Sequence, residues 1–492
     1  MYIQLPIRIS RCSDETLQSQ IINQLRDSIG NGCLKPASRL PSVRELAKQL
    51  GVSVNTVLLA YDELHSEGII ERKPGLGTYV SDRRPADFIL TPAAEDGAGA
   101  QCCERLADRQ PPVFSGRRQM VVRDDSAVPD IDFWLGRPDA GSFPLKAWRR
   151  RVNVRLKHAG QQLVNYGDPA GLYELRAVIA DHLAQTRGFR ARPEQIIITH
   201  GIQEGLSLVS RLLLRPGAEV LVESPCYTGA YYLFESYGAR LHSVPVDTGG
   251  LQAGRLPPGD ISLAYVTPSH QYPTGYTLSY PRRQQLLAWA WQHNCYIFED
   301  DYDADFRYGS SPLPALMSLD SRGCVIYAGT FSKSMGAGLR LGYLVLPAEI
   351  AEHARTVKSQ LDNGNSWLNQ AAMADFIRGG DYLHHLHRIR ERYRNRQETL
   401  IRQLSRRFGE AEVSGTEGGM HLAWHLPDTF PDADSIQRMS EAVGVGVYTI
   451  KNCASLAADN SRISHRVLLF GYAAVPEVKI TEAVARMARL PL

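Results

Sequence analysis

The sequence has no long uninterrupted apolar run. None of its 492 residues lies in a stretch approaching the roughly 18 consecutive apolar residues that a membrane-spanning helix needs. The first ten residues, MYIQLPIRIS, also lack the basic and then apolar layout of a secretory signal peptide. We therefore expect a cytoplasmic protein with no membrane partner.

Cysteine is scarce and scattered. The eight cysteines include no C-x-x-C pair, and Cys102 and Cys103 are merely adjacent. This number is too small for a disulfide framework in so long a chain, and we expect no bound metal. The net charge of +3 is also small. It neither requires nor excludes nucleic acid, because binding depends on where Lys and Arg cluster.

The length of the chain predicts more than one domain, since 492 residues exceed what one hydrophobic core usually organises. Residues 1–80 contain helical periodicity followed by a hairpin signal. Residues 81–128 lose all periodicity and are rich in Ala, Pro, Gly, Asp and Arg, which predicts a flexible linker. Residues 129–492 form the third segment, with a rhythm of alternating strands and helices.

The first segment carries clear helix boundaries. Apolar residues at helical spacing predict a helix over residues 16–29. Ser42 and Glu45 form an S-x-x-E capping box that starts a second helix, which Gly51 ends, and Ser53 can cap a third. The stretch IIERKPGLGTYV then places two apolar ends around a turn, as in a β-hairpin. Together these signals predict a winged helix-turn-helix.

A winged helix-turn-helix places the first turn of its recognition helix against base edges and uses flanking residues for phosphates. Taken singly, each candidate is better explained as a cap or a solvated charge. The stretch RLPSVRELAKQLGVSVNTVLLAYDELHSEGIIERKPGLGTYV, however, closely resembles the GntR family of bacterial winged-helix regulators. The expected DNA-binding residues are Arg39, Ser42, Arg44, Ser53, Asn55, Thr56, Lys73, Gly75 and Gly77.

From about residue 130 onward, short β-rich runs alternate with helical runs. The β-rich runs are EQIIITH, EVLVESP, SLAYVTP, CYIFEDD, CVIYAGT and LRLGYLVLP. Runs that are apolar on both faces suit a mainly parallel sheet buried between helices. We therefore expect a large α/β domain with a smaller C-terminal α/β subdomain and with its ligands at the carboxyl ends of the strands.

Two motifs in this domain point to one cofactor. YAGTFSKSMGAGLRLGY places Lys333 just after a strand, with Thr330, Ser332 and Arg340 nearby, and YIFEDDYDADF ends a strand at Asp300. Both resemble motifs of fold-type I aminotransferases. The resemblance implies that Lys333 forms a Schiff base with pyridoxal 5′-phosphate and that Asp300 pairs with the pyridine nitrogen. The alternatives are a surface lysine in a Ser/Gly loop and a carboxylate that caps a strand end.

Further motifs follow in the chain order of that fold. The resemblance assigns a phenol near the cofactor O3′, phosphate contacts, a ring-stacking tyrosine and a tyrosine that reaches the neighbouring subunit's phosphate. VTPSHQYPTG resembles an N-P-T-G motif, but Tyr272 stands in place of its asparagine, so His270 or Gln271 are the candidate substitutes. The remaining residues assigned in this way are Tyr302, Thr330, Ser332, Arg340, Gly201, Ile202, Gln203, Tyr227 and Tyr166.

The fusion of these two domains resembles the MocR subfamily of GntR-type regulators. The resemblance implies a transcription regulator that binds operator DNA as a homodimer, arranged head to tail, and senses pyridoxal phosphate or a small amine or amino-acid effector through a Lys333 aldimine. One alternative is a functional aminotransferase with an accessory winged helix. Another is a repressor whose C-terminal domain has lost the cofactor and only dimerises.

One position departs from the aminotransferase pattern. Relatives carry a carboxylate-binding arginine near the C-terminus, where this sequence reads VLLFGYAAV and places Leu469, and a second arginine is replaced by Gly229. We expect Arg466 on the opposite face of the same strand. The loss favours pyridoxal phosphate or an amine without a carboxylate as the signal. A shifted alignment would restore Arg466 or Arg462 as the anchor, and Lys451 is a further candidate.

Overall fold

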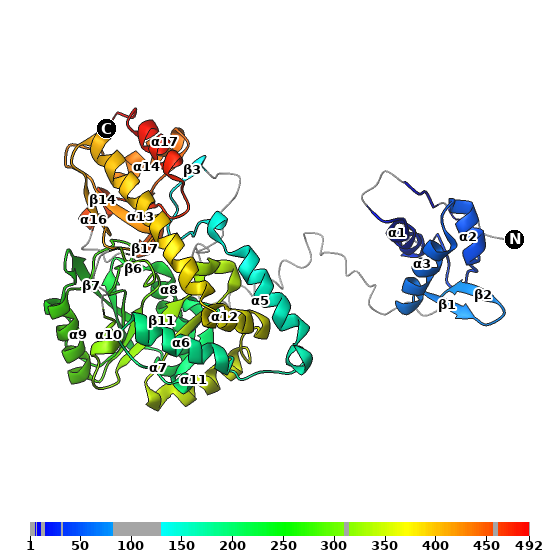
Figure 1. Cartoon of the computed structure of the whole chain (residues 1–492), viewed down its shortest axis with the longest axis horizontal. Coiled ribbons are helices and arrows are strands. Elements are labelled where there is room, and N and C mark those ends of the chain that lie inside the picture. Colours follow the sequence, from blue (N-terminus) through cyan, green and yellow to red (C-terminus); the bar gives the residue numbers. More distant parts are fainter. Residues whose placement is uncertain are drawn as a thin grey trace, which may run out of the picture. The chain divides into compact units, whose positions relative to one another are not determined.

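The computed structural model describes Leu5 and residues 7–10, 15–30, 33–81, 129–308, 314–455 and 461–491 (Figure 1). The chain divides into two compact units, Met1–Pro111 and Pro112–Leu492. All but the first residue of the linker expected at 81–128 lies outside the described residues, so its flexibility stays a prediction. Each unit is described by itself below.

The N-terminal unit is a three-helix bundle followed by an antiparallel hairpin. Its elements are α1 (Leu17–Gly30), α2 (Val43–Leu50), α3 (Val54–Ser66), β1 (Ile70–Lys73) and β2 (Gly77–Val80). The predicted capping box is present, since the Ser42 hydroxyl accepts from the Glu45 amide at 3.3 Å and the Glu45 carboxylate accepts from the Ser42 amide at 2.9 Å. The order and types of elements predicted for a winged helix-turn-helix are confirmed.

Short helices need both caps and packing to be stable. Gly51 ends α2 with a φ of +64°, and the Ser53 hydroxyl accepts from the Thr56 amide to start α3. The buried residues of α3 are Val57, Ala60, Tyr61 and Leu64, and the Tyr61 hydroxyl donates to the Pro41 carbonyl at 2.9 Å. Local capping and one shared core therefore fix the turn between the two helices.

The C-terminal unit is built on an eight-stranded sheet in the order β4-β12-β11-β10-β9-β5-β7-β8. The six expected strands all belong to it. β12 runs antiparallel to both of its neighbours, and β8 runs antiparallel to β7, while the other pairings are parallel. The strands are β4 (Ile196–Thr199), β5 (Glu219–Ser224), β7 (Arg240–Asp247), β8 (Gly250–Leu251), β9 (Ile261–Val266), β10 (Tyr296–Asp300), β11 (Val325–Thr330) and β12 (Gly342–Val345).

Helices cover both faces of this sheet, because its strands are apolar on both faces. Within β4, Ile196 and Ile198 pack with α6 and α12, while Ile197 packs on the other face with α7, α8 and α11. The face that Ile196 shares is extended by α9. The bounds are α6 (Tyr173–Thr186), α7 (Ile202–Leu213), α8 (Thr228–Ser236), α9 (Tyr280–His293), α11 (Ala348–Leu361) and α12 (Trp367–Arg378).

A smaller C-terminal subdomain follows the long helix α13 (Asp381–Phe408), as expected (Figure 1). Its four-stranded antiparallel sheet has the order β13-β14-β18-β16. The elements are β13 (Glu412–Ser414), β14 (His421–His425), α14 (Ala433–Ala442), β16 (Tyr448–Thr449), α16 (Ser461–Arg466), β18 (Val467–Gly471) and α17 (Glu477–Met487). In the described part of the chain, no helix is both long and apolar enough to cross a membrane.

Replacing Ser42 by Ala should weaken the N-terminal unit, because the Glu45 amide loses its acceptor and the capping box is broken. We expect a cost of about 1 kcal/mol. Hydrogen exchange of the α2 amides in the full-length protein measures it. The control is Ser66→Ala, whose hydroxyl only donates to Glu63 in an exposed last turn. Equal effects of the two changes would contradict the stabilising role of the cap.

Candidate cofactor site and DNA-binding surface

Lys333 lies at the carboxyl end of the large sheet, in a short π-helical turn that follows β11. Its Nζ donates to the Gly136 carbonyl at 3.1 Å. Gly136 has a φ of +73°, and a Cβ there would lie 2.6 Å from Nζ, so only glycine fits. Burial lowers the pKa of Lys333, against the opposing effect of the Asp303 and Asp300 charges. A larger fraction of the amine is therefore neutral and able to attack a carbonyl.

Asp300 ends the neighbouring parallel strand β10 and is buried. Its Oδ2 accepts from the Tyr265 hydroxyl at 2.7 Å, whereas its Oδ1 has no hydrogen-bond partner among the described residues. Burial raises the pKa of Asp300 to about 7, helped by the nearby Asp301 and Asp303 and opposed by the Tyr265 bond. An unpartnered buried carboxylate oxygen is costly unless a donor or a cation fills the site. A protonated pyridine nitrogen is such a donor.

Tyr302 and His270 form a polar group close to these two residues. The Tyr302 hydroxyl donates to the His270 carbonyl at 3.1 Å, and His270 Nδ1 lies 2.7 Å from the Asp303 carboxylate. The Gln271 amide is fully engaged, because its nitrogen donates to Pro225 and its oxygen accepts from Thr274. These bonds favour His270 over Gln271 as the substitute for the missing asparagine. Three glycines at which a Cβ would lie within 3.1 Å of the His270 ring enclose it: Gly275, Gly415 and Gly419.

Tyr227 stands at the start of α8 and packs edge to face on Tyr272, with ring centroids 5.7 Å apart. Burial raises the pKa of Tyr227 to about 12, and the Asp300 charge adds to this while the Arg340 charge opposes it. A Cβ at Gly229 would lie 2.5 Å from the Tyr227 ring. Any side chain at position 229 would thus displace this ring, which gives the absent second arginine a steric reason.

The amino end of α7 and Arg340 make a place for an anion. Gly201 begins α7 with a φ of +106° and no side-chain cap, so the first amides of the helix point out of it unshielded. The Arg340 guanidinium lies 3.7 Å from where a Cβ on Gly201 would be. Arg340 is reached through a π turn and a 3-10 turn, not through a continuous helix, and its own φ is +52°. A cation beside a positive helix end is favourable when an anion lies between them.

The other predicted phosphate and dimer residues divide into two groups. Thr330 and Ser332 are hydrogen-bonded to each other at 3.0 Å next to Lys333. Ile202 and Gln203 open α7, and the Gln203 amide donates to the Gly229 carbonyl. Tyr166, by contrast, is 89% exposed and lies outside this group. The structure therefore brings together all the predicted cofactor residues except Tyr166.

The place expected for a carboxylate-binding arginine is apolar. Leu469 lies in the middle of β18, is fully buried, and pairs with Ala423 and Tyr448 in one hydrophobic cluster. The expectation that Arg466 occupies the opposite face of this strand is wrong, because Arg466 ends the preceding helix α16. Its guanidinium donates to the Leu426, Pro427 and Phe430 carbonyls.

Of the other two candidate anchors, one is engaged elsewhere and the other has a side chain outside the described residues. Lys451 Nζ is paired with the Asp434 carboxylate at 2.6 Å. Arg462 belongs to α16, but its side chain lies outside the described residues. A cation that the sequence did not single out, Arg137, follows Gly136 and is paired with Asp132 at 2.9 Å.

The predicted DNA-binding residues lie on the exposed side of α2, α3 and the hairpin. Asn55 is exposed in the first turn of α3, between Ser53 and the half-buried Thr56. The Arg39 guanidinium approaches the hairpin, 3.3 Å from where a Cβ on Gly77 would be. Of the other predicted residues, Ser42 caps α2, Arg44 is exposed on α2, Lys73 pairs with Glu71 and lies over the Tyr79 ring, and Gly75 has a φ of +74°.

Sequence reasoning missed several residues of the cofactor site. Asp303 is three residues after Asp300, and Tyr265 is buried in β9, so a closer reading of strand ends could have found both. His421, whose ring lies 4.7 Å from that of His270, comes from the C-terminal subdomain. Gly136 contacts Lys333 across 197 residues of sequence. The local sequence carries no signal for either contact.

Comparison with known families agrees with this geometry. Residues 131–486 match the aminotransferase class I and II family, and residues 17–80 match the bacterial regulatory proteins of the gntR family. A multiple substrate aminotransferase from Thermococcus profundus aligns with a TM-score of 0.69 and 25% identity over 78% of this chain and 97% of that one. A kynurenine aminotransferase from Pyrococcus horikoshii aligns with a TM-score of 0.66 and 24% identity over 82% and 96%.

The whole chain also has relatives among regulators. It is 34% identical to the probable rhizopine catabolism regulatory protein MocR of Rhizobium meliloti over 89% of this chain and 87% of that one. It is 32% identical to the pyridoxine biosynthesis transcriptional regulator PdxR of Corynebacterium glutamicum over 86% of both. The two units thus define a transcription regulator that joins a winged helix-turn-helix to an aminotransferase-type domain. The chain belongs to the MocR subfamily of GntR-type transcription regulators.

The raised pKa of Asp300 predicts a pH-dependent stability of the cofactor-free protein. A carboxyl group whose folded pKa is about 7 against an ordinary 3.8 binds its proton more tightly in the folded state. The stabilisation that this tighter proton binding gives the folded state is fully present below pH 3.8 and is lost as the pH rises through about 7. When the pH is raised from about 5 to about 8, the free energy of unfolding should therefore fall in both proteins, and the fall should be smaller in Asp300→Asn by on the order of 2 kcal/mol.

Urea unfolding of the cofactor-free protein at the two pH values measures this difference. Part of the pH dependence should remain in the variant, because burial also raises the pKa of Glu223 and of Glu299 to about 7. An Asp300→Asn protein with the same pH dependence as the wild type would show that Asp300 is ionised at neutral pH without a bound partner.

Proposed function

We propose that this regulator binds operator DNA through its winged helix and holds pyridoxal phosphate on Lys333 as a sensor of a primary amine that lacks a carboxylate. The observation that carries the proposal is a buried Lys333 and a buried Asp300 near an apolar carboxylate position. Burial lowers the pKa of Lys333, and Asp300 keeps one oxygen without a partner among the described residues. Leu469 lies in a hydrophobic cluster, and Arg466 and Lys451 are engaged elsewhere.

Each polar group of the site has a task in this proposal. Pyridoxal phosphate supplies, when bound, an aldehyde that condenses with amines and an electron-withdrawing ring. Arg340 and the first amides of α7 bind the phosphate, Tyr227 packs on the ring, and Asp300 accepts from the pyridine nitrogen. Lys333 holds its Nζ unprotonated for the exchange with an incoming amine. Tyr302, whose hydroxyl donates to the His270 carbonyl in this structure, would turn its single proton to the phenolic oxygen when the cofactor is bound.

An apolar position in place of a guanidinium changes which ligands bind well. An arginine holds a carboxylate by two charge-assisted hydrogen bonds. A carboxylate next to Leu469 would lose its hydrogen bonds to water and gain none from the protein in return. Amines without a carboxylate avoid this penalty. The same loss disfavours turnover, because the substrate's α-carbon is no longer oriented by a second anchor. A functional aminotransferase with an accessory winged helix is the second candidate, since Lys333 and Asp300 also suit catalysis.

We also propose that the protein acts as a homodimer, in which two winged helices bind paired operator repeats. The support is an exposed apolar surface around the first helices of the C-terminal unit, because such patches mark interaction sites. Its members are Val154, Leu156, Leu163, Val164 and Tyr166, each at least 45% exposed. In this arrangement, Tyr166 reaches the phosphate of the neighbouring subunit. The head-to-tail orientation is part of the same proposal.

The cofactor proposal is tested by titrating the purified holoprotein with matched pairs, such as phenethylamine with phenylalanine and tyramine with tyrosine. We expect each amine to change the visible spectrum at a concentration at least about tenfold lower than its amino acid, since a lost bidentate contact is worth more than 1 kcal/mol. Borohydride reduction followed by peptide mapping should place the cofactor on Lys333.

Two variants serve as controls. Lys333→Ala should lose the reducible adduct, and Lys451→Ala, which changes a lysine that is paired with Asp434, should keep it. Amino acids that bind better than their amines, with steady formation of keto acid, would favour the functional aminotransferase. A protein that gives no reducible adduct after incubation with pyridoxal phosphate would overturn the cofactor proposal.

Operator binding is tested by selecting duplexes from a random pool with the full-length protein. We expect one motif to be enriched as a repeat, because a dimer presents two recognition helices. Asn55→Ala should weaken binding to the selected duplex by roughly 10- to 100-fold, the cost of one good base contact. Asn23→Ala, at an exposed position of α1, is the matched control. Equal binding by the Asn55 and Asn23 variants would exclude base recognition by Asn55.

A further inference from the structure

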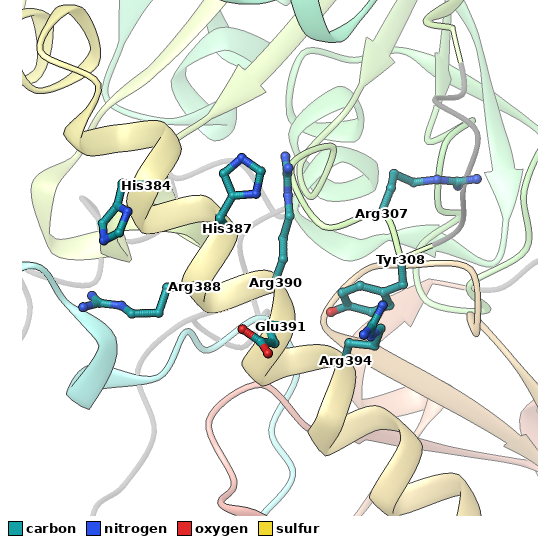
Figure 2. Close-up of a pocket in the computed structure, with 8 residues that line it drawn as sticks. All are labelled: Arg307, Tyr308, His384, His387, Arg388, Arg390, Glu391 and Arg394. Carbon is teal, nitrogen blue, oxygen red and sulfur yellow. The ribbon is translucent and has the colours of Figure 1, made fainter.

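A basic hollow of about 520 Å³ lies along α13, and none of the residues assigned to the cofactor lines it (Figure 2). Its side chains come from α13 and from the segment that follows Tyr302 and Asp303. Four of them are arginines, two are histidines, and one is an acid. The hollow is lined by Arg307, Tyr308, His384, His387, Arg388, Arg390, Glu391 and Arg394.

The arginines of the hollow are only partly neutralised by the protein. Arg388 donates to the neutral Ser142 carbonyl, whereas Arg390 donates to the Asp305 carbonyl and also lies near the Asp305 carboxylate. Arg307 and Arg394 form ion pairs with exposed carboxylates, Glu417 at 3.4 Å and Glu398 at 3.6 Å. Such pairs contribute little in water.

Like charges held together repel each other, so this arrangement is unfavourable unless an anion is bound. The hollow is therefore best explained as a binding surface for negative charge.

The length of the basic row indicates an extended anion. His384, His387, Arg388 and Arg394 follow one another along α13, and the ten residue steps from the first to the last span about 15 Å at a rise of 1.5 Å per residue. A single phosphate would contact only part of this row. One strand of B-DNA carries a phosphate every ~3.4 Å of its axis, so about four phosphates span the same length.

We propose that the hollow on α13 binds backbone phosphates of duplex DNA that flanks the operator. The inference rests on the proposed function, because the winged helix brings the duplex to this chain. A duplex held by the first unit is at high local concentration for the second, so a few extra phosphate contacts add measurable affinity. The exposed Arg149 and Arg150 of α5 (Leu145–Lys157) extend the basic surface, since Arg150 pairs with Asp381 at the start of α13.

The test compares two duplexes with the full-length dimer. One contains only the selected operator, and the other adds about three helical turns of random sequence on each side, near 30 base pairs. The flanks should raise the affinity of the wild type by on the order of tenfold at low salt. Arg388→Gln/Arg394→Gln should lose this gain and reduce the slope of log K against log salt by about 2, since each lost phosphate contact lowers it by ~0.9.

A double variant on the same helix provides the matched control. Arg402→Gln/Arg406→Gln removes the same net charge from exposed positions of α13 outside the hollow, and it should keep the gain from the flanks. Both double variants should bind the short operator as the wild type does. If they lost the gain equally, the effect would be general electrostatics and the proposal would be wrong.

Other outcomes distinguish a failure of the hollow's role from a failure of the proposed function. A wild type that binds the short operator but gains nothing from the flanks overturns the role of the hollow and leaves the proposed function intact. If inorganic pyrophosphate then raised the melting temperature of the wild type and not that of Arg388→Gln/Arg394→Gln, the hollow would hold a free phosphate ligand instead. A protein that selects no duplex contradicts the proposed function, and the hollow's role with it.

Discussion

The burial of three consecutive carboxyl groups at the end of β10 is the constraint on which the site depends. Glu299 accepts from the Leu316 and Met317 amides, and Asp301 forms a buried ion pair with Arg187. Asp300 and Asp301 each keep one oxygen without a hydrogen-bond partner among the described residues, but Asp300 has no guanidinium paired with it and lies near the buried Lys333. Asp300 is thus the carboxyl group of the three with neither two backbone amides nor a guanidinium to balance its charge, which favours a ligand there.

Local chemistry made much of the molecule predictable from the sequence. Capping side chains such as Ser42 and Ser53 act within three residues, so the boundaries of the winged helix follow from the letters alone. The strands that are apolar on both faces, and the motifs around Asp300 and Lys333, are equally local. What the sequence could not fix were contacts between distant segments, such as Gly136 with Lys333 and His421 with His270, because nothing local specifies them.

The same distinction explains why the alternatives at two positions needed a structure. Gln271 and His270 are adjacent and both polar, and only their bonds show that Gln271 is used up within its own loop. Arg466 lies three residues before Leu469, which placed it on the opposite face of an assumed strand. The strand begins one residue later than assumed, so Arg466 is instead the last residue of helix α16. Its guanidinium donates to a backbone carbonyl of another segment, at Phe430. A boundary error of one residue reversed its interpretation.

Tyr227, which we propose to stack on the cofactor, is joined to the smaller subdomain through its backbone. Tyr227 pairs with Ala454 in a short antiparallel ladder, and the Thr228 hydroxyl donates to the Cys453 carbonyl. The Tyr227 ring lies over the backbone of Gly229, 2.5 Å from where a Cβ there would be, so the ring packs closely on the helix that follows it. Packed interfaces of this kind switch between discrete arrangements and do not deform gradually. In the proposed function, an amine that binds one arrangement better than another would shift the population of the smaller subdomain and give the sensor an output without turnover.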